Sequence, residues 1–331
     1  MSTRSKLILC LCGILTVSAA LVSLFIFEKS PNNALPVVAI ANYGPHASLE
    51  ETLRGIRDGL AQEGFKESHH ITLRISDVNF DASLIPQMIS KLKTMTPRVM
   101  VALTTPVAQV LKNNSLKVPK VFSAITDPVA AGLLETEYTS YQGMTGVSDR
   151  QDLSVFLRFV KKLLPNAHTI GILYATGEAN DLALVKMIED AASKENMKVI
   201  AVGVDHPRDI PLRMTAFKGK VDFIYVGLSG PIQPALPTIV ASADEMNIPV
   251  FNADSDAVKN HLVLGSCGVM PYQVGIRTGQ IIARLLRGEA PEAIPPFYPS
   301  QADHKGFVSQ KRAERYGIFQ VEKLQDVTCV V

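Results

Sequence analysis

The chain has 331 residues, is 47% hydrophobic, and carries 33 Lys and Arg residues against 31 Asp and Glu residues, a formal net charge of +2. A chain of this length can bury a large core, and cores beyond roughly 250–300 residues tend to split, so we expect two lobes. Beyond residue 30 the acidic and basic residues are equal in number. A charge-balanced body gives no electrostatic reason to expect a nucleic-acid partner.

The N-terminus combines a positive end with a long apolar run. Arg4 and Lys6 precede residues 7–27, which contain no charged residue. The run fits a secretory signal peptide cleaved after Ala19 or Ala20, or an uncleaved anchor, because about 20 apolar residues span a bilayer. A buried helix of a cytosolic protein is a third interpretation. We therefore expect residues 1–30 to be a signal peptide or an N-terminal anchor to the inner membrane. The body is then periplasmic or extracytoplasmic.

From Pro36 onward, short β-rich runs alternate with helical patterns. The expected strands are 37–41, 71–78, 99–103 and 118–125, followed by a second series at 169–174, 199–204, 223–226, 249–251 and 262–264. Helical periodicity appears between them, at 48–64, 84–92, 181–195, 234–246 and 272–287. This alternation predicts an α/β fold of two lobes, each with a parallel sheet and right-handed crossovers. We assign residues 36–146 plus 267–295 to lobe 1 and residues 147–266 plus 296–331 to lobe 2.

The first helix has both a start signal and a small-residue pattern. Ser48 and Glu51 fit the S-x-x-E capping box, in which each side chain satisfies the other's backbone N–H. Gly55 and Gly59 lie within the same amphipathic pattern and indicate close helix packing rather than a phosphate-binding loop.

Small polar residues follow most of the expected strands. In open parallel sheets a ligand binds at the carboxyl ends of the strands, so these loops are the candidate site. The loops contain Tyr43, Thr104, Thr105, Thr126, Asp127, Glu178, Asn180, Ser229, Asp254, Asp256 and Tyr272. Helix capping alone explains Thr105, Asp127 and Asn180 about as well as ligand contact does. The composition of the loops is that of a cleft for a small ligand.

The sequence motifs do not support a catalytic or metal-binding function. The chain contains no H-E-x-x-H, G-x-S-x-G or G-x-x-x-x-G-K-[ST] sequence, so we assign no catalytic residue and no cofactor. The His69-His70 pair lacks a third nearby ligand, and we assign no metal site. Outside the N-terminal run only Cys267 and Cys329 remain, which could form a disulfide or stay as thiols.

Several longer motifs, in the right order, carry a resemblance. They are Leu103-Thr104-Thr105-Pro106-Val107-Ala108-Gln109, Thr126-Asp127-Pro128-Val129-Ala130-Ala131-Gly132-Leu133, Met144-Thr145-Gly146-Val147-Ser148-Asp149, and the stretches 163–167, 171–180 and 248–258. Across residues 37–318 the chain resembles the ABC transporter substrate-binding proteins of the tryptophan/tyrosine-binding type. That family has the type I periplasmic binding protein fold, so the resemblance implies two Rossmann-like lobes joined by a hinge, with the ligand cleft between them.

The resemblance implies capture of a small organic solute, often an amino acid, by closure of the lobes. It further implies delivery to an ABC permease driven by an ATPase. Carried over residue by residue, it places Thr104, Thr105, Thr126, Asp127, Glu178, Asn180, Asp254 and Asp256 at the ligand. Two segments depart from the family pattern, Gly227-Leu228-Ser229-Gly230 and Gly268-Val269-Met270-Pro271-Tyr272-Gln273-Val274-Gly275, and both lack its acidic residues. The alternative function is a membrane-anchored sensor that reports ligand occupancy to a signalling partner.

Overall fold

The computed structural model describes residues 35–115 and 117–331. The expected signal peptide or anchor lies outside the described residues. No helix in the described part of the chain is long and apolar enough to cross a membrane. Residues from Pro36 to Val331 form one compact unit, which contains two β-sheets.

The first sheet has the order β2-β1-β3-β4-β5, and all its strand pairs are parallel. Its strands are β1 (Val37–Ala41), β2 (Thr72–Ser76), β3 (Val99–Leu103), β4 (Lys120–Ile125) and β5 (Met144–Ser148). Helices α2 (Ala47–Gln62) and α10 (Pro271–Leu286) pack on one face of the sheet, and α3 (Ile85–Lys93) and α4 (Thr105–Lys112) pack on the other. Apolar side chains fill both interfaces, so β1, β3 and β4 are buried almost throughout.

The second sheet has the order β12-β11-β10-β9-β8-β6-β7. Its strands are β6 (Thr169–Ala175), β7 (Lys198–Val204), β8 (Phe223–Val226), β9 (Val250–Asn252), β10 (Gly265–Val269), β11 (His304–Ser309) and β12 (Val327–Val330). The pairs are parallel except for β10 with β11. The expected α/β fold with parallel sheets is confirmed, and the antiparallel β11 is an addition that the sequence pattern did not predict.

Helices cover both faces of the second sheet as well. They are α5 (Leu153–Leu163), α6 (Ala179–Lys194) and α11 (Gln310–Arg315) on one face, and α7 (Ile210–Met214), α8 (Leu236–Glu245) and α9 (Ser255–Lys259) on the other. A cluster of aromatic rings, Phe156, Phe223, Tyr225 and Phe251, packs edge to face or tilted beneath α5. Such contacts add to the burial of apolar surface.

The chain passes between the two sheets after β5, between β10 and α10, and before β11. Near the last passage, Phe297 donates its backbone N–H to Gly146 and accepts from Ser148, which ties this segment to β5. At the second passage, β10 pairs in the second sheet while the next helix, α10, packs beside α2 on the first. The residue boundaries that we assigned to the lobes stay a prediction.

The structure corrects the expected capping box at Ser48 and answers whether Cys267 and Cys329 form a disulfide. Helix α2 begins two residues earlier than the capping box requires, with His46 rather than Ser48 at the N-cap and no side-chain capping bond. The Ser48 hydroxyl instead donates to the carboxylate of Asp254 at 2.8 Å. Asp254 is distant in sequence and follows β9 of the second sheet, so a local capping pattern could not predict this bond. Cys267 and Cys329 are both free thiols, and burial raises the pKa of Cys267 to about 11.

Candidate functional site

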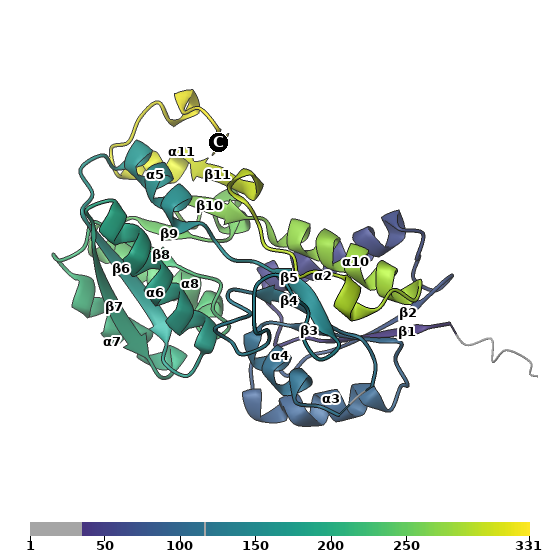
Figure 1. Ribbon diagram of the computed structural model, residues 1–331. Helices are drawn as coiled ribbons and strands as arrows, with labels where there is room; N and C mark the ends of the chain where they lie inside the picture. Colours follow the sequence, from purple (N-terminus) through teal and green to yellow (C-terminus); the bar gives the residue numbers. More distant parts are fainter. Residues whose placement is uncertain (1–34, 116) are drawn as a thin grey trace, which may run out of the picture. The chain divides into compact units, whose positions relative to one another are not determined.

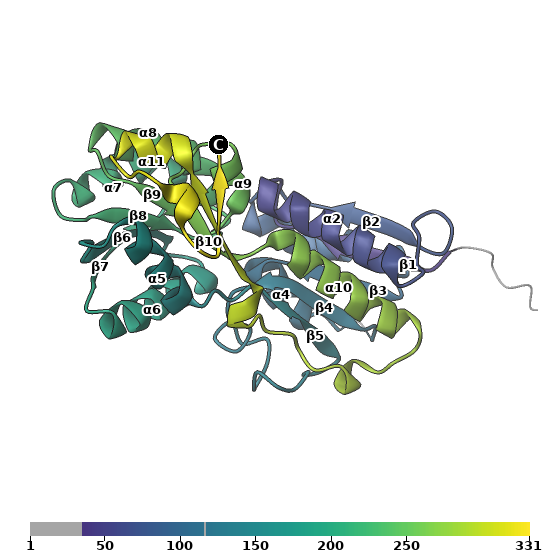
Figure 2. The same ribbon diagram turned by 90° about the horizontal axis from the view of Figure 1, so that it is seen from above.

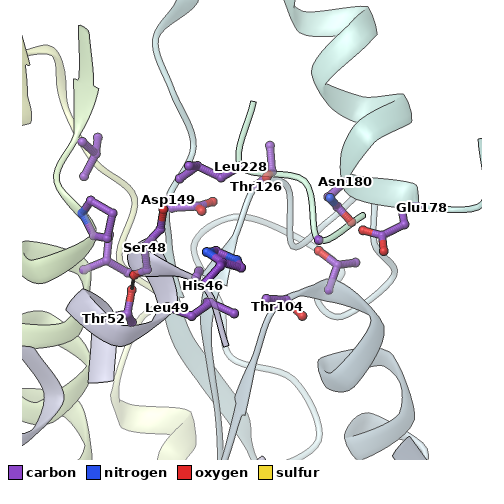
Figure 3. Close-up of a pocket in the computed structure, with 16 residues that line it drawn as sticks. His46, Ser48, Leu49, Thr52, Thr104, Thr126, Asp149, Glu178, Asn180 and Leu228 are labelled. Atoms are coloured by element: carbon purple, nitrogen blue, oxygen red, sulfur yellow. Dashed lines mark hydrogen bonds between the residues drawn. The ribbon is translucent and has the colours of Figure 1, made fainter. Parts of the chain in front are cut away.

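A pocket lies at the carboxyl ends of the strands of both sheets (Figure 3). It holds about 500 Å³ of space not filled by protein atoms, part of it open to solvent. Its lining residues come from the segments that follow β1, β3, β4, β5, β6, β8 and β10. This is the position that the topology of open parallel sheets predicts for a ligand.

The expected site residues fall into three groups. Thr104, Thr105, Thr126, Glu178 and Asn180 line the pocket. Tyr43, Ser229 and Asp254 lie behind the lining, where each is buried and interacts with a carboxylate or hydroxyl group near the pocket. Asp127, Asp256 and Tyr272 are not among the lining residues.

The three outlying residues have partners that explain their position. Asp127 accepts hydrogen bonds from the backbone of Val129 and Ala130 and forms an ion pair with Arg150 at 2.9 Å. Asp256 pairs with Lys259 one helical turn away. Tyr272 donates its hydroxyl hydrogen to Asp58 at 2.9 Å. Asp127 therefore stabilises a turn, Asp256 stabilises a helix, and Tyr272 joins helices α10 and α2.

The backbone of the pocket contains two strained positions. Thr104 has a φ of 75° at the start of α4, and Ala124 has a φ of 56°, next to the register shift between β4 and β5. Positive φ is uncommon for residues other than glycine, above all for β-branched ones. Strain of this kind tends to occur at functional sites, and here both residues line the pocket.

Sequence reasoning missed several lining residues. They are His46, Ser48, Leu49, Thr52, Ala124, Asp149, Leu228, Gly230, Val269, Pro271 and Val274. Asp149 is the last residue of the motif Thr145-Gly146-Val147-Ser148-Asp149, and its place directly after β5 was a signal that could have identified it. The others lie at strand ends, in the loop after β8, or in the first turns of α2 and α10, and their direction toward the pocket depends on packing.

Polar atoms in the lining are buried without a hydrogen-bond partner among the described residues. They are His46 Nδ1, Thr104 Oγ1, Asp149 Oδ1, Glu178 Oε1 and Asn180 Oδ1. Most of these atoms are acceptors, and the lining contains no Lys or Arg. Because a buried polar group without a partner costs free energy, the pocket is suited to a ligand that donates hydrogen bonds.

The ionisable groups of the pocket have shifted pKa values. Burial raises the pKa of Glu178 to about 7, and the neighbouring Asp181 adds to the rise. Burial also raises the pKa of Asp149 to about 6 and lowers that of His46 to about 4. Tyr43, buried and close to Glu178, has a raised pKa as well. At neutral pH His46 is therefore uncharged, and the pocket carries negative charge.

Helix N-termini also contribute to the electrostatic potential of the pocket. Helices α2, α4, α6 and α10 all begin at residues that line the pocket or lie next to them. The first N–H groups of a helix lack partners within it and attract anions. The pocket thus combines carboxylates suited to an ammonium group with helix ends suited to a carboxylate.

Comparison with known proteins gives one family and several relatives. The sequence model of the ABC transporter substrate-binding proteins matches residues 37–329. A tyrosine-binding protein of Clostridioides difficile (strain R20291) is 27% identical over 268 residues, which are 81% of this chain and 77% of the relative.

Two solved structures are similar over most of the chain. The ABC domain in complex with L-Trp from Streptococcus pneumonia has a TM-score of 0.84 at 28% identity, covering 90% of this chain and 100% of that one. The ligand-free, open structure of a substrate-binding protein with adhesive properties from Clostridium difficile has a TM-score of 0.69 at 26% identity, covering 89% and 99%. The fold is that of type I periplasmic binding proteins.

Proposed function

Since the chain belongs to the family of ABC transporter substrate-binding proteins, we propose that it binds a free amino acid outside the cytoplasm for an ABC importer. The ligand passes to a permease and an ATPase and is released chemically unchanged. The observation that carries this proposal is the pocket itself, with unpartnered acceptors on Asp149 and Glu178 and no Lys or Arg in the lining.

The zwitterion of an amino acid matches both kinds of group in the pocket. Its ammonium group can donate to Glu178, whose buried Oε1 has no partner among the described residues. Its carboxylate can accept from Thr105 and from the N-terminal N–H groups of α4, which begins at that residue. The relatives that bind tyrosine and L-Trp support the same ligand class.

The mechanism that we propose is closure of the two halves around the ligand. A ligand that binds the closed arrangement more tightly shifts the population toward it. The TM-score is higher against the L-Trp complex than against the ligand-free, open structure, although the two identities are nearly equal. This supports the view that the described arrangement corresponds to the ligand-bound one.

A thermal-shift screen of the purified full-length chain tests the proposal. Amino acids, purines and sugars are added singly, and a ligand at a hundredfold excess over Kd stabilises the folded state by about 2.7 kcal/mol. We expect amino acids alone to raise the Tm, and calorimetry and chromatography to recover the bound ligand unchanged. The double variant Thr105→Val and Thr126→Val should lose the shift. The exposed Thr94→Val should keep it. A shift with purines or sugars only, or conversion of the ligand, would refute the proposal.

A further inference from the structure

Two of the three passages between the sheets are tied together at both ends. The first passage, residues 149–152, leads from β5 to α5, and the third, residues 298–303, leads to β11. Beside the first sheet, the backbone of Phe297 exchanges hydrogen bonds with β5, each at 2.9 Å. Beside the second sheet, the Asp152 N–H donates to Nε2 of His304 at 2.7 Å. His304 therefore joins the two passages at the end next to the second sheet.

The hydrogen bonds of His304 require a neutral imidazole ring. Its Nε2 accepts from a backbone N–H, so this nitrogen carries no proton. Its Nδ1 lies 2.9 Å from the carbonyl oxygen of Ser300, which can only accept, so Nδ1 carries the proton of the neutral ring. The side chain is 9% exposed, so little water reaches it. A second proton, on Nε2, would remove the acceptor and set two N–H groups against each other.

Four charged side chains lie near this ring. They are Asp152 at the start of α5, Asp303 before β11, Lys305 on β11 and Arg277 on α10. On the neighbouring strand β10, the residue opposite His304 is the uncharged Val269. The two acids attract a proton to the ring, and histidine is the side chain whose charge commonly changes between pH 5 and pH 8. Acidification therefore competes with the hydrogen bond from Asp152.

The first passage also contains a residue of the pocket. Asp149 lines the pocket three residues before Asp152. Between them, Gln151 accepts from the Val269 N–H at 3.0 Å and donates to the Asp149 carbonyl at 2.9 Å. Val269 lines the pocket as well. A movement of the first passage away from His304 would therefore displace side chains that line the pocket.

We infer that His304 is a pH-sensitive switch that regulates ligand binding: a second proton on its ring releases Asp152, the first passage moves, and ligand affinity falls. The coupling is reciprocal, so a bound ligand disfavours the proton on His304 by the same factor. This regulation rests on the proposed function, which places the chain outside the cytoplasm, where it meets the external pH.

Amide hydrogen exchange of the ligand-free, full-length chain, resolved by NMR, tests the release. From pH 8 to pH 5 we expect the protection of the Asp152 N–H, corrected for the intrinsic exchange rate, to fall by roughly tenfold. The Asp149 N–H should lose protection with it. His304→Gln keeps an acceptor but cannot ionise, so protection should change by less than about threefold. His261→Gln is the matched control, because His261 bonds to the Ser309 hydroxyl at 2.9 Å, which can donate or accept, and should behave as the wild type does.

Calorimetry with L-tryptophan and L-tyrosine at pH 8 and pH 5.5 tests the effect on binding. Protonation of Asp149 and Glu178 should weaken binding in both proteins, so the ratio of affinities between the wild type and His304→Gln isolates the switch. We expect similar affinities at pH 8 and roughly threefold weaker binding by the wild type at pH 5.5.

Three results would overturn the inference. They are constant protection of the Asp152 N–H in the wild type, an equal loss of protection in His304→Gln, and an affinity ratio that does not change with pH. Loss of protection at Asp152 without any loss at Asp149 would also overturn it, because the switch would not reach the pocket. The proposed function fails by a different result, the absence of binding by any amino acid, and the exchange measurement needs no ligand.

Discussion

Glu178 has a carboxyl group that the fold buries, which disfavours its ionised form. It is 8% exposed, and its neighbour Asp181 is 2% exposed. Asp181 is held by the Ala175 N–H at 2.6 Å and by the Asn180 amide at 3.0 Å, whereas one oxygen of Glu178 has no such partner in the described part of the chain. Burial raises the pKa of both groups, to about 7 and about 6. Ionisation of Glu178 therefore lowers the stability of the ligand-free protein, and we propose that the carboxylate gains a partner when a ligand donates to it.

Replacing Glu178 by Gln should stabilise the free protein at pH 8. The pKa of Glu178 is raised from 4.5 to about 7 on folding, so between these pH values the folded state binds more protons than the unfolded chain. The free energy of unfolding therefore falls as the pH rises through this interval. Gln cannot ionise, so Glu178→Gln should be more stable at pH 8 by on the order of 3 kcal/mol.

The measurement is calorimetric unfolding of the ligand-free protein at pH 4.5 and pH 8. At pH 4.5 we expect little difference between Glu178→Gln and the wild type. Glu189→Gln is the matched control, because Glu189 lies on the same helix and is exposed. It should not change the stability at either pH. Destabilisation of Glu178→Gln at pH 8 would show that the carboxylate is satisfied in the free protein.

Helices α2 and α10 lie side by side, as Figure 2 shows. They contact each other closely through glycines. A Cβ at Gly55 would lie 2.1 Å from the backbone oxygen of Tyr272, and one at Gly275 would lie 2.1 Å from that of Thr52. Gly59 and Gly279 are in similar contact with the opposite helix. Both helices begin at the pocket, so this packing positions Ser48, Leu49, Pro271 and Val274 in the lining.

Gly55→Ala should destabilise the protein by about 1 to 3 kcal/mol, because the added methyl group forces the two helices apart. Chemical denaturation measures the effect. Gly177→Ala is the matched control, since a Cβ there meets no atom within 4 Å, and we expect no loss of stability. If Gly55→Ala were as stable as the wild type, the close approach of the helices would not be required for the fold.

Two contacts directly join the halves of the Pro36–Val331 unit, that is, the part around the first sheet and the part around the second sheet. Ser48, at the start of α2, donates to Asp254, which follows β9 in the second sheet, at 2.8 Å. The Tyr43 ring lies against Gly230, where a Cβ would come within 2.6 Å of it. In the closure mechanism that we propose, such contacts would stabilise the closed arrangement whichever ligand is bound.

Ser48→Ala should therefore shift the population toward an open arrangement. It removes the donor to Oδ2 of the buried Asp254 carboxylate, whose Oδ1 still accepts from the Asp256 N–H, at a cost of about 1 to 3 kcal/mol. We expect the affinity for every amino acid to fall by a similar factor, and small-angle scattering of the ligand-free protein to show a larger radius of gyration. Ser83→Ala is the control, because its hydroxyl bonds to Asp81 within one half. A loss that differs between ligands, with unchanged scattering, would instead indicate direct ligand contact.

The sequence by itself determined the alternation of strands and helices and the face that each helix buries, because both follow from local periodicity. It also identified Thr104, Thr105, Thr126, Glu178 and Asn180 as site candidates, since residues after parallel strands share one edge of a sheet. Tertiary structure decided which side chains turn inward. Asp149 and His46 line the pocket, while Tyr272 and Asp256 find partners elsewhere. The direction of a side chain at a helix end depends on the rotation of that helix and on partners distant in sequence, as the bond from Ser48 to Asp254 shows, and no local pattern encodes these.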